Sequence, residues 1–376
     1  MSDNLQMHVT MRILLLGEYS NVHATLAEGL RCLGHEVVVA SNGDFWKNYP
    51  RDIDLKRHDG PLAGLRLWMK VMANLHKFSG FDIVQIINPM FLELKAGRHF
   101  KILDYLIRHN RKLVLCAMGM DYYWVHENIT RKPLRYGDFN IGNELRTNEE
   151  AMVERNDWVG TDKQRLNIIC AEKADAIVTG LYEYDVCYRP NFPDKTTFIP
   201  LPIKMELFSD EVYKHLEGNK IKVFIGISKN RSVYKGTDIM LQAARDLEKR
   251  FPDKIEVKVA EGIPFSEYRK MMLGSDIIMD QLYSYTPAMN ALEAMSHGII
   301  CMGGGEPENY HILGETELRP IINVEPNYQS VFNALEDIVQ HPERIPELKR
   351  QSREYIRRHH DHMKVAKQYE ALYKSI

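Results

Sequence analysis

One stretch of the chain, Tyr285–Glu308, combines a single helical carboxylate with a glycine-rich turn. The turn contains Gly303, Gly304 and Gly305, and a new helix is expected to start directly after them. Glycines leave backbone amides bare, and bare amides at the start of a helix bind phosphate. The carboxylate, Glu293, is of the kind that takes the hydroxyls of a ribose. The stretch therefore indicates a nucleotide site in the second half of the chain.

Local signals in this stretch predict a helix, a strand and a second helix. Thr286 is a good N-cap, Pro287 a good first helical residue, and Gly298 a good helix end. The apolar run Ile299–Met302 is typical of a short buried strand. The second helix is expected to begin at Glu306, directly after the glycines.

Basic residues gather on an earlier turn that follows the predicted strand Ile221–Ile225. Lys229, Arg231 and Lys235 lie close together in the chain, and Gly236 comes next. Cations at a strand-to-helix turn can hold a diphosphate, and arginine offers a bidentate clamp. A solvated basic loop would have the same composition. The turn gains specificity because the acid and the glycine turn are expected at the same edge of the same sheet.

Two turns in the first half are also candidates. Gly17 ends the first predicted strand and lets a ligand approach the backbone, although a simple tight turn would also need it. Asp121 follows the predicted strand that ends at Ala117 and could orient a sugar hydroxyl or assist proton transfer. An N-cap or turn aspartate is the alternative. Neither the Gly-x-Gly-x-x-Gly dinucleotide motif nor the Gly-x-x-x-x-Gly-Lys-Ser/Thr phosphate loop occurs.

Strands and helices alternate along both halves of the chain, which predicts an α/β protein with two doubly wound, Rossmann-like domains. Strands are expected at Met11–Leu16, Glu36–Ala40, Phe81–Ile87, Lys112–Ala117, Ala174–Val178, Thr197–Ile199, Ile221–Ile225, Ile255–Val259, Asp276–Met279, Ile299–Met302 and Ile321–Val324. Helices are expected at His23–Leu33, Phe91–His109, Gly236–Arg250, Phe265–Leu273 and Tyr328–Gln340. Ligands of such domains sit beyond the carboxyl ends of the strands, so two facing domains would share one cleft.

The predicted domain limits follow from these elements. Residues 1–10 are expected to be a flexible leader, 11–202 an acceptor-side domain and 203–352 a nucleotide-binding domain. A long helix over 346–375 carries several basic residues, and its end, from 353 to 376, is expected to pack back on the first domain. Residues 136–168 lack strand signals and are either an extra helical layer, a mobile cover or a surface excursion.

The composition of the chain argues against several classes of function. The 49 Lys and Arg residues balance 51 Asp and Glu residues, which argues against a general nucleic-acid binder. The five cysteines are scattered without a C-x-x-C pair, which favours a reduced, cytoplasmic protein without a structural zinc site. No apolar run reaches the length of about 18 residues expected of a membrane helix. Basic residues near the chain end leave a peripheral membrane contact open.

The pattern resembles the two-domain GT-B glycosyltransferases, and among them the retaining enzymes of family 4. The resemblance covers the chain from Met11 onward and is strongest between Ile221 and Glu308. Glu293 leads an Ala-x-x-x-Gly sequence, as does the family acid that holds the nucleotide ribose. Lys235 and its following glycine match the family's diphosphate-binding pair, with Arg231, or alternatively Lys229, as the accompanying cation.

The sequence also departs from the family pattern. A first acid is expected eight residues before Glu293, near the donor sugar, and Tyr285 stands there. Met118 replaces a histidine before the Gly-Met-Asp element that contains Asp121. The resemblance further assigns Gly17 to the glycine turn of the acceptor domain. It assigns to donor binding the glycine turn, Gly303–Gly305, and the Glu306 that follows it.

The resemblance implies a retaining hexosyltransferase that moves a sugar from a nucleotide-diphosphate sugar to a glycan or lipid-linked acceptor, in cell-surface polysaccharide synthesis. No cofactor and no metal are implied, because Arg231 and Lys235 would stabilise the leaving diphosphate. Asp121 would lie near the acceptor. The unusual Tyr285 keeps a second hypothesis open, namely an inactive nucleotide-binding scaffold subunit. An epimerase or a phosphorylase on the same fold is a third.

Overall fold

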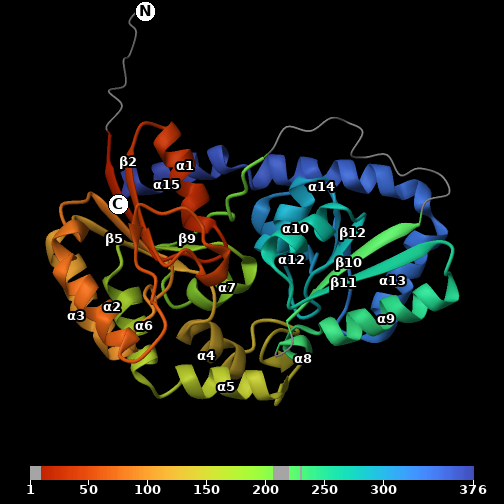
Figure 1. The fold of residues 1–376 in the computed structure, drawn as a ribbon, viewed down its shortest axis with the longest axis horizontal. Coiled ribbons are helices and arrows are strands. Elements are labelled where there is room, and N and C mark those ends of the chain that lie inside the picture. Colours follow the sequence, from red (N-terminus) through yellow and green to blue (C-terminus); the bar gives the residue numbers. More distant parts are fainter. Residues whose placement is uncertain (1–9, 206–219, 229–230) are drawn as a thin grey trace, which may run out of the picture. The chain divides into compact units, whose positions relative to one another are not determined.

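The computed structural model describes residues 10–205, 220–228 and 231–376. The predicted cation Lys229 and nearly all of the predicted leader lie outside these residues. The chain divides into two compact units, and the colours of Figure 1 locate their segments by residue number. Unit 1 takes Met1–Gly119, Asp162–Val178 and His362–Ile376, and unit 2 takes Met120–Thr161 and Thr179–Asp361. Each predicted domain is one continuous stretch of the chain. Unit 1 instead combines three separate segments, and unit 2 combines two.

A seven-stranded sheet with the order β3-β2-β1-β4-β5-β8-β9 forms the core of the first half. Its strands are β1 (Arg12–Leu16), β2 (Glu36–Ser41), β3 (Ile53–Asp54), β4 (Ile83–Ile86), β5 (Lys112–Ala117), β8 (Ala176–Thr179) and β9 (Thr196–Phe198). The helices of unit 1 are α1 (Val22–Cys32), α2 (Ala63–Ala73), α3 (Ala96–His109), α6 (Asp162–Lys173) and α15 (His362–Ser375), with short turns η1 (Phe45–Lys47) and η2 (Leu75–Phe78). The apolar residues of β1 after Arg12 are completely buried, as expected for a parallel strand covered on both faces.

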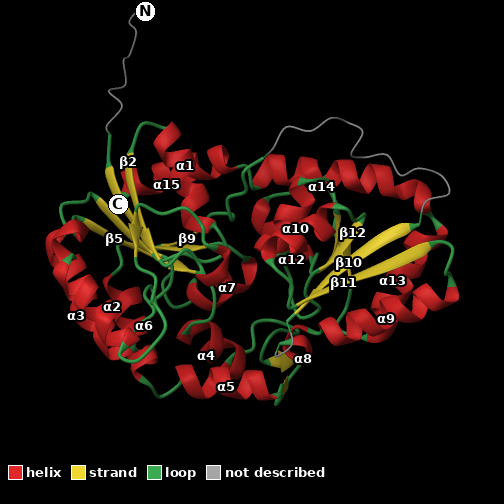
Figure 2. Cartoon of the chain, viewed as in Figure 1, coloured by secondary structure: helices red, strands yellow, loops and turns green. Residues whose placement is uncertain are grey.

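A five-stranded parallel sheet with the order β11-β10-β12-β13-β14 forms the core of unit 2 (Figure 2). Its strands are β10 (Ile221–Ile227), β11 (Ile255–Glu261), β12 (Ile277–Met279), β13 (Ile300–Gly303) and β14 (Ile322–Asn323). The helices of the unit are α4 (Tyr122–Thr130), α5 (Glu149–Trp158), α7 (Tyr182–Tyr188), α8 (Ser232–Lys235), α9 (Thr237–Arg250), α10 (Phe265–Leu273), α11 (Met289–Ser296), α12 (Pro307–Leu313), α13 (Tyr328–Gln340) and α14 (Ile345–His359), with the short turn η4 (Pro342–Arg344). The predicted class of two parallel α/β sheets is confirmed.

The segment around residues 136–168 contains strands that its sequence did not predict. Strands β6 (Asn140–Ile141) and β7 (Glu144–Leu145) form a small antiparallel hairpin between α4 and α5. Residues 120–161 belong to unit 2. Two-residue strands carry no periodic signal, which explains why they were missed.

Three predicted helix boundaries are wrong, and the first is that of α3, which begins at Ala96 instead of Phe91. Helix α11 begins at Met289 instead of Pro287, and Thr286 does not cap it. The amide and hydroxyl of Thr286 are instead bound by the Glu183 carboxylate, at 3.0 and 2.6 Å. The predicted long helix 346–375 is two helices, α14 and α15, separated at His360. The amide of Ile203 donates to the carbonyl of His360 at 2.7 Å, which holds this break.

Most basic residues of α14 are paired with carboxylates. Lys349 is 6% exposed and binds Asp276, Arg350 binds Glu347, and Arg357 binds Glu354. Ion pairs between residues on one helix neutralise its surface, so α14 offers little free positive charge to a lipid. No helix within the described part of the chain is both long and apolar enough to cross a membrane.

Candidate functional site

Three loops of unit 2 pack against one another at the carboxyl edge of the five-stranded sheet. They follow β10, β12 and β13, and two of them contain glycines that the packing requires. A Cβ on Gly236 would lie 2.6 Å from the Leu282 side chain, and a Cβ on Gly304 would lie 2.2 Å from the Ser284 carbonyl. The Leu282 amide also donates to the Lys235 carbonyl at 2.9 Å. The predicted Lys-Gly pair and glycine turn therefore meet at the edge where α/β sheets bind ligands.

Lys235 lies beside a carboxylate that the sequence analysis missed. Asp280 comes directly after β12, and its charge interacts with that of Lys235. Burial raises the pKa of Asp280, and the Lys235 ammonium partly opposes that increase. An ammonium and a carboxylate with a perturbed pKa at a strand end are typical of a functional site. The lysine is half-buried, so its charge acts in a partly desolvated setting.

Glu293 lies on α11, in a polar cluster that joins it to α10. Arg269 donates to its carboxylate at 3.1 Å, and the side chain of Glu293 stays 34% exposed. Tyr268 accepts a hydrogen bond from Asn290 at 2.8 Å, and the charges of Glu293 and Asp280 both act on its hydroxyl. The Tyr268 ring fits over Gly226, where a Cβ would lie 2.6 Å from its oxygen. An exposed carboxylate held by an arginine can accept from two ribose hydroxyls.

The amide of Gly305 is not bare, although the sequence analysis expected bare amides along the glycine turn. The amide of Gly305 donates to Asn323 Oδ1 at 2.9 Å, and that of Glu306 donates to the Tyr285 carbonyl at 3.1 Å. Helix α12 begins at Pro307, one residue after the predicted Glu306, which is its N-cap. The turn is therefore fixed by its own neighbours. The roles of Gly303, Gly304 and Gly305 in donor binding stay predictions.

Glu306 anchors the turn to the segment before the β6–β7 hairpin. Its carboxylate is 8% exposed and accepts from Tyr136, from Asn323 at 3.1 Å and from Arg135 at 2.6 Å. Arg135 also pairs with Glu308 on α12. Protein groups thus occupy both oxygens of Glu306, so its predicted contact with a donor would require one of them to leave.

Tyr285, which stands in place of the expected acid, contacts Arg135 instead. Its hydroxyl accepts from the Arg135 amide at 2.7 Å, and the Arg135 guanidinium lies 4.9 Å from the centre of its ring. Glu183 on α7 fixes the backbone here by accepting from the amides of Tyr285 and Thr286 at 2.8 and 3.0 Å and from Ser284 at 3.1 Å. Glu183 is thus a positioning residue that local patterns could not reveal.

Arg231 lies at the start of α8, next to the Asp138 carboxylate. Asp138 belongs to the hairpin region, by which we mean strands β6 and β7 with their flanking residues from 135 to 146. The Arg231 guanidinium is 5.0 Å from the centre of the Tyr234 ring, and it interacts electrostatically with Asp138. Arg146, which is 9% exposed, donates to the carbonyls of Val233 and Tyr234 at 2.8 and 2.9 Å. The hairpin region therefore holds the turn that carries Arg231 and Lys235.

Asp121 has the geometry of a helix N-cap. It is completely buried, and it accepts from the Trp124 amide at 2.8 Å and from the Tyr188 hydroxyl at 2.6 Å. Burial raises its pKa to about 6. A capped and buried carboxylate is the structural alternative stated for this residue. The catalytic role predicted for Asp121 consequently finds no support in its surroundings.

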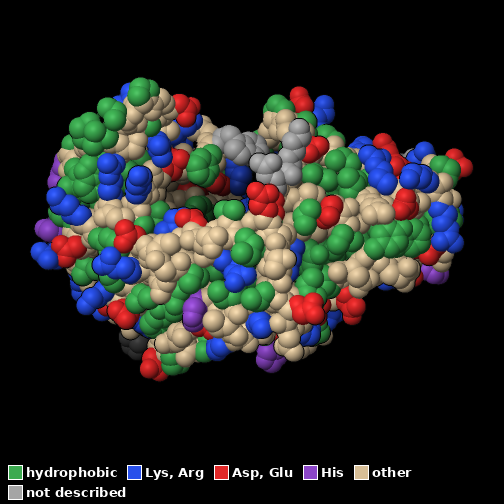
Figure 3. All heavy atoms as spheres, turned by 90° about the horizontal axis from the view of Figure 1, so that it is seen from below, with side chains coloured by type: hydrophobic (Ala, Val, Ile, Leu, Met, Phe, Trp, Pro, Cys, Tyr) green, Lys and Arg blue, Asp and Glu red, His purple; other side chains and the backbone are tan. Residues whose placement is uncertain are grey.

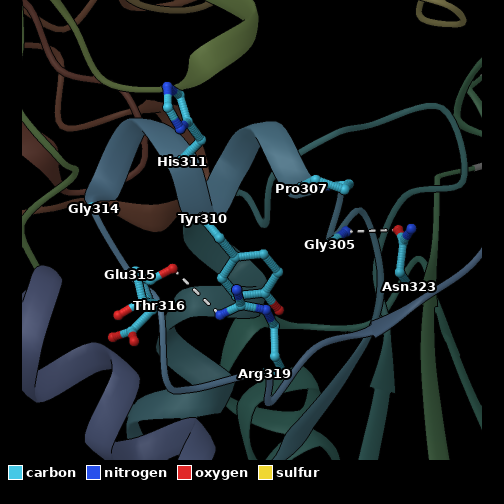
Figure 4. A pocket seen from close by; sticks show the side chains of 9 residues that line it. All are labelled: Gly305, Pro307, Tyr310, His311, Gly314, Glu315, Thr316, Arg319 and Asn323. Atoms are coloured by element: carbon cyan, nitrogen blue, oxygen red, sulfur yellow. Dashed lines mark hydrogen bonds between the residues drawn. The ribbon is translucent and has the colours of Figure 1, made fainter.

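A pocket of about 590 Å³ lies beside the glycine turn, between α12 and the loop before β14 (Figure 4). Gly305 and Asn323 form one side, and Glu315 and Arg319 lie on the other. The Arg319 guanidinium stacks 4.3 Å from the centre of the Tyr310 ring and donates to the Glu315 carbonyl at 3.3 Å. Gly305 is the one predicted donor residue among those lining the pocket.

Gly17 lies in unit 1, at a turn where packing requires a glycine. Its φ is +86°, and a Cβ would lie 2.5 Å from the Ile87 side chain. The next residue, Glu18, is 2% exposed and accepts from the amides of His23 and Ala24 at 3.2 and 2.8 Å. The start of α1 is thus capped by the protein's own carboxyl group, which leaves no room there for a phosphate.

We expect Glu18 to impose a pH dependence on stability. Burial raises its pKa to about 8, while burial lowers the pKa of His23 to about 4. Between pH 6.5 and 8 the folded chain keeps a proton on Glu18 that the unfolded chain loses. The free energy of unfolding should then fall by about 1 to 2 kcal/mol over this range. Urea unfolding of wild type and Glu18→Gln tests this, and an equal slope in the variant would contradict it.

No protein-family model matches the chain, and no curated protein matches it either. Solved structures, in contrast, do match the chain. HepE from Anabaena, in a complex with UDP-glucose, superimposes with a TM-score of 0.59 at 13% identity, covering 97% of this chain and 100% of HepE. Sucrose-phosphate synthase from Thermosynechococcus elongatus gives a TM-score of 0.63 at 14% identity, covering 97% and 98% of the two chains. The likeness shows the fold.

A third neighbour widens the range of chemistry on this fold. A putative UDP-N-acetylglucosamine 2-epimerase from Listeria monocytogenes gives a TM-score of 0.54 at 10% identity, covering 96% of this chain and 95% of the epimerase. The predicted GT-B architecture is confirmed by these likenesses. Identities this low carry the architecture alone, so function must be argued from the site.

Several residues of the site were missed by the sequence analysis. Asp280 has a signal, since it is an acid directly after an apolar strand. Tyr268 and Arg269 lie on a correctly predicted helix, but nothing in the sequence assigns them to Glu293. Glu183 and Arg135 contact loops more than 100 residues away in the chain, so spacing alone gives no hint of them.

Proposed function

We propose that the protein is a glycosyltransferase that takes a sugar from a nucleotide-diphosphate donor. The observation that carries this proposal is the meeting of Lys235, Asp280 and the Glu293 cluster at the carboxyl edge of one parallel sheet. A cation and a ribose-binding acid at such an edge match the two ends of a nucleoside diphosphate. The fold likeness to HepE, whose structure contains UDP-glucose, supports the same ligand class.

In this proposal the donor's nucleoside lies near α10 and α11, with the ribose hydroxyls on Glu293. Arg269 orients that carboxylate by donating to it at 3.1 Å. The diphosphate lies near Lys235, with Arg231 as a second cation. Arg231 is exposed at the start of α8, so it can turn toward a ligand.

The proposed reaction retains the anomeric configuration. The bond from the anomeric carbon to the diphosphate oxygen breaks, and a bond to the acceptor oxygen forms on the same face of the sugar. The acceptor proton passes to the departing diphosphate, so no separate protein base is needed. Lys235 and Arg231 stabilise the charge that develops on the leaving group, without a metal or other cofactor. The acceptor is proposed to be a glycan or lipid-linked sugar of a cell-surface polysaccharide.

Glu293 provides a direct test of this arrangement. Glu293→Ala should weaken binding of a ribonucleoside diphosphate by at least about tenfold, because each hydrogen bond to a charged group contributes roughly 1.5 to 3 kcal/mol. The 2′,3′-dideoxy analogue should bind wild type and variant alike. Calorimetric titration measures both. A variant that weakens the two ligands equally would place the ribose elsewhere.

A second candidate is the nucleotide-binding scaffold. The observation that favours it is the occupation of the Asp121 and Glu306 carboxylates by protein donors, together with Tyr285 in place of an acid. A scaffold would bind the nucleoside diphosphate but would not cleave the nucleotide sugar. An epimerase would convert the nucleotide sugar to its isomer with no acceptor present. Product analysis after incubation with nucleotide sugars separates the three activities.

A further inference from the structure

Helix α2 of unit 1 exposes apolar side chains on one side. Leu62, directly before the helix, is 71% exposed, Leu65 is 38% exposed and Met69 is 53% exposed. Their spacing of three and four residues places them on the same face of the helix. The opposite face, with Leu67 and Val71, is buried. Single exposed apolar residues are common, but three along two turns of one helix form a patch.

The most exposed of these residues also has an unfavourable backbone conformation. Leu62 has φ 62° and ψ 17°, in the left-handed region that large side chains rarely adopt. Among the described residues it has the highest exposed fraction of any large hydrophobic side chain. Its strain is therefore not offset by burial of the side chain. Backbone strain that persists in this way is concentrated at functional positions.

Basic side chains surround this patch. Arg66 and Lys70 lie on α2 beside Leu65 and Met69, and Arg98 of α3 donates to the Gly64 carbonyl at 2.6 Å. A Cβ on Gly64 would lie 3.9 Å from the guanidinium of Arg57. Lys70 lies 4.0 Å from Asp54. Across the described ranges, no carboxylate forms an ion pair with the guanidinium of Arg57, Arg66 or Arg98, although Glu93 accepts from the Arg57 backbone amide at 3.1 Å. Figure 3 shows one face of the molecule, with Lys and Arg side chains among hydrophobic ones at its left end.

We propose that the exposed face of α2 binds the surface of a membrane that contains anionic lipid. An interfacial helix places apolar side chains at the acyl boundary and cations among the headgroups, and α2 provides both. Charge complementarity supports this partner, because the basic side chains around the patch attract anionic headgroups. Most basic residues of α14, in contrast, are already paired with carboxylates. This proposal does not depend on the proposed transferase activity.

Co-sedimentation with lipid vesicles tests the proposal on the full chain. Wild type should bind vesicles of phosphatidylcholine mixed with phosphatidylglycerol, and should bind pure phosphatidylcholine much more weakly. The variant Leu62→Ser/Leu65→Ser/Met69→Ser should bind the mixed vesicles at least about tenfold more weakly. The variant Arg66→Glu/Lys70→Glu should lose at least roughly fivefold for each residue changed.

Matched controls lie elsewhere on the surface. Val153→Ser removes a side chain that is 58% exposed on α5, and Lys249→Glu reverses a charge on α9. Both should bind vesicles as wild type does. Wild type that ignores anionic vesicles, or α2 variants that bind them equally well, would overturn the proposal. A dimer of wild type that dissociates in the triple variant, without vesicle binding, would instead assign the face to self-association. Circular dichroism of each variant confirms that it is folded.

Discussion

Replacing Lys235 with alanine is expected to lower the rate of donor cleavage by about 100- to 1000-fold. Losses of this size follow when one preorganised charged donor to the developing anion is removed. Lys235 is half-buried beside Asp280 at the carboxyl edge of the sheet, so water replaces its charge poorly. The rate of nucleoside diphosphate release from a nucleotide sugar measures the effect.

Two comparisons make the Lys235 result specific. Lys249→Ala changes an exposed lysine on α9 and should leave the rate unchanged. Binding of the nucleoside without phosphates should be equal in wild type and Lys235→Ala, because the lysine is proposed to contact the diphosphate alone. If Lys235→Ala cleaves the donor at the wild-type rate, the proposed position of the diphosphate is wrong.

Replacing Glu183 with alanine is expected to lower the free energy of unfolding by about 3 kcal/mol and to abolish donor cleavage. The Glu183 carboxylate is 4% exposed and accepts from the amides of Tyr285 and Thr286 and from two hydroxyls. Without it, buried donors remain unpaired, which costs about 1 to 3 kcal/mol each. The loop that they hold, Ser284–Thr286, packs directly on Gly304, so the donor side of the site should move with it.

Glu183→Gln separates the two parts of this prediction. Glutamine keeps one acceptor oxygen for the backbone amides, and the Thr286 hydroxyl can rotate to accept from its NH₂ group. The free energy of unfolding should therefore fall by only about 1 kcal/mol, and activity should be partly retained. Urea unfolding followed by fluorescence gives the stability of both variants. An alanine variant as stable as wild type would contradict the anchoring role of Glu183.

The parts of the structure that follow local rules were predicted from the sequence. Strand β5 and helices α10 and α13 have the predicted limits, because apolar periodicity and turn residues mark both their ends. The helix end before Gly298, which has φ +75°, was predicted for the same reason. Alternation of these elements was sufficient to predict two parallel sheets.

The candidate site could be predicted only in part. Lys235 and the glycine turn were found because each lies next to the end of a strand or helix, and Glu293 because it precedes the Ala-x-x-x-Gly helix end. The partners that complete the site come from distant segments, as Glu183 does for Tyr285 and Arg135 does for Glu306. These contacts depend on tertiary packing. The wrong prediction of Thr286 as a helix N-cap has the same cause. Its amide and hydroxyl donate to Glu183, and helix α11 begins only at Met289.

Arg135 shows how the departure from the family pattern is accommodated. An acid in place of Tyr285 would lie next to the carboxylates of Glu306 and Glu308 and repel them. The tyrosine instead offers an aromatic face to the Arg135 guanidinium, at 4.9 Å, and its hydroxyl to the Arg135 amide. The change at this position is therefore coupled to the hairpin region that supplies Arg135.

The central claim, a nucleoside diphosphate site on unit 2, is tested most directly by thermal shift with uridine, guanosine, adenosine and cytidine diphosphates. A ligand that binds the folded chain raises its melting temperature by mass action. We predict that one of the four raises it, and that Lys235→Ala and Glu293→Ala each reduce the shift. If none of the four changes the melting temperature of wild type, the nucleotide site and the transferase proposal built on it are contradicted.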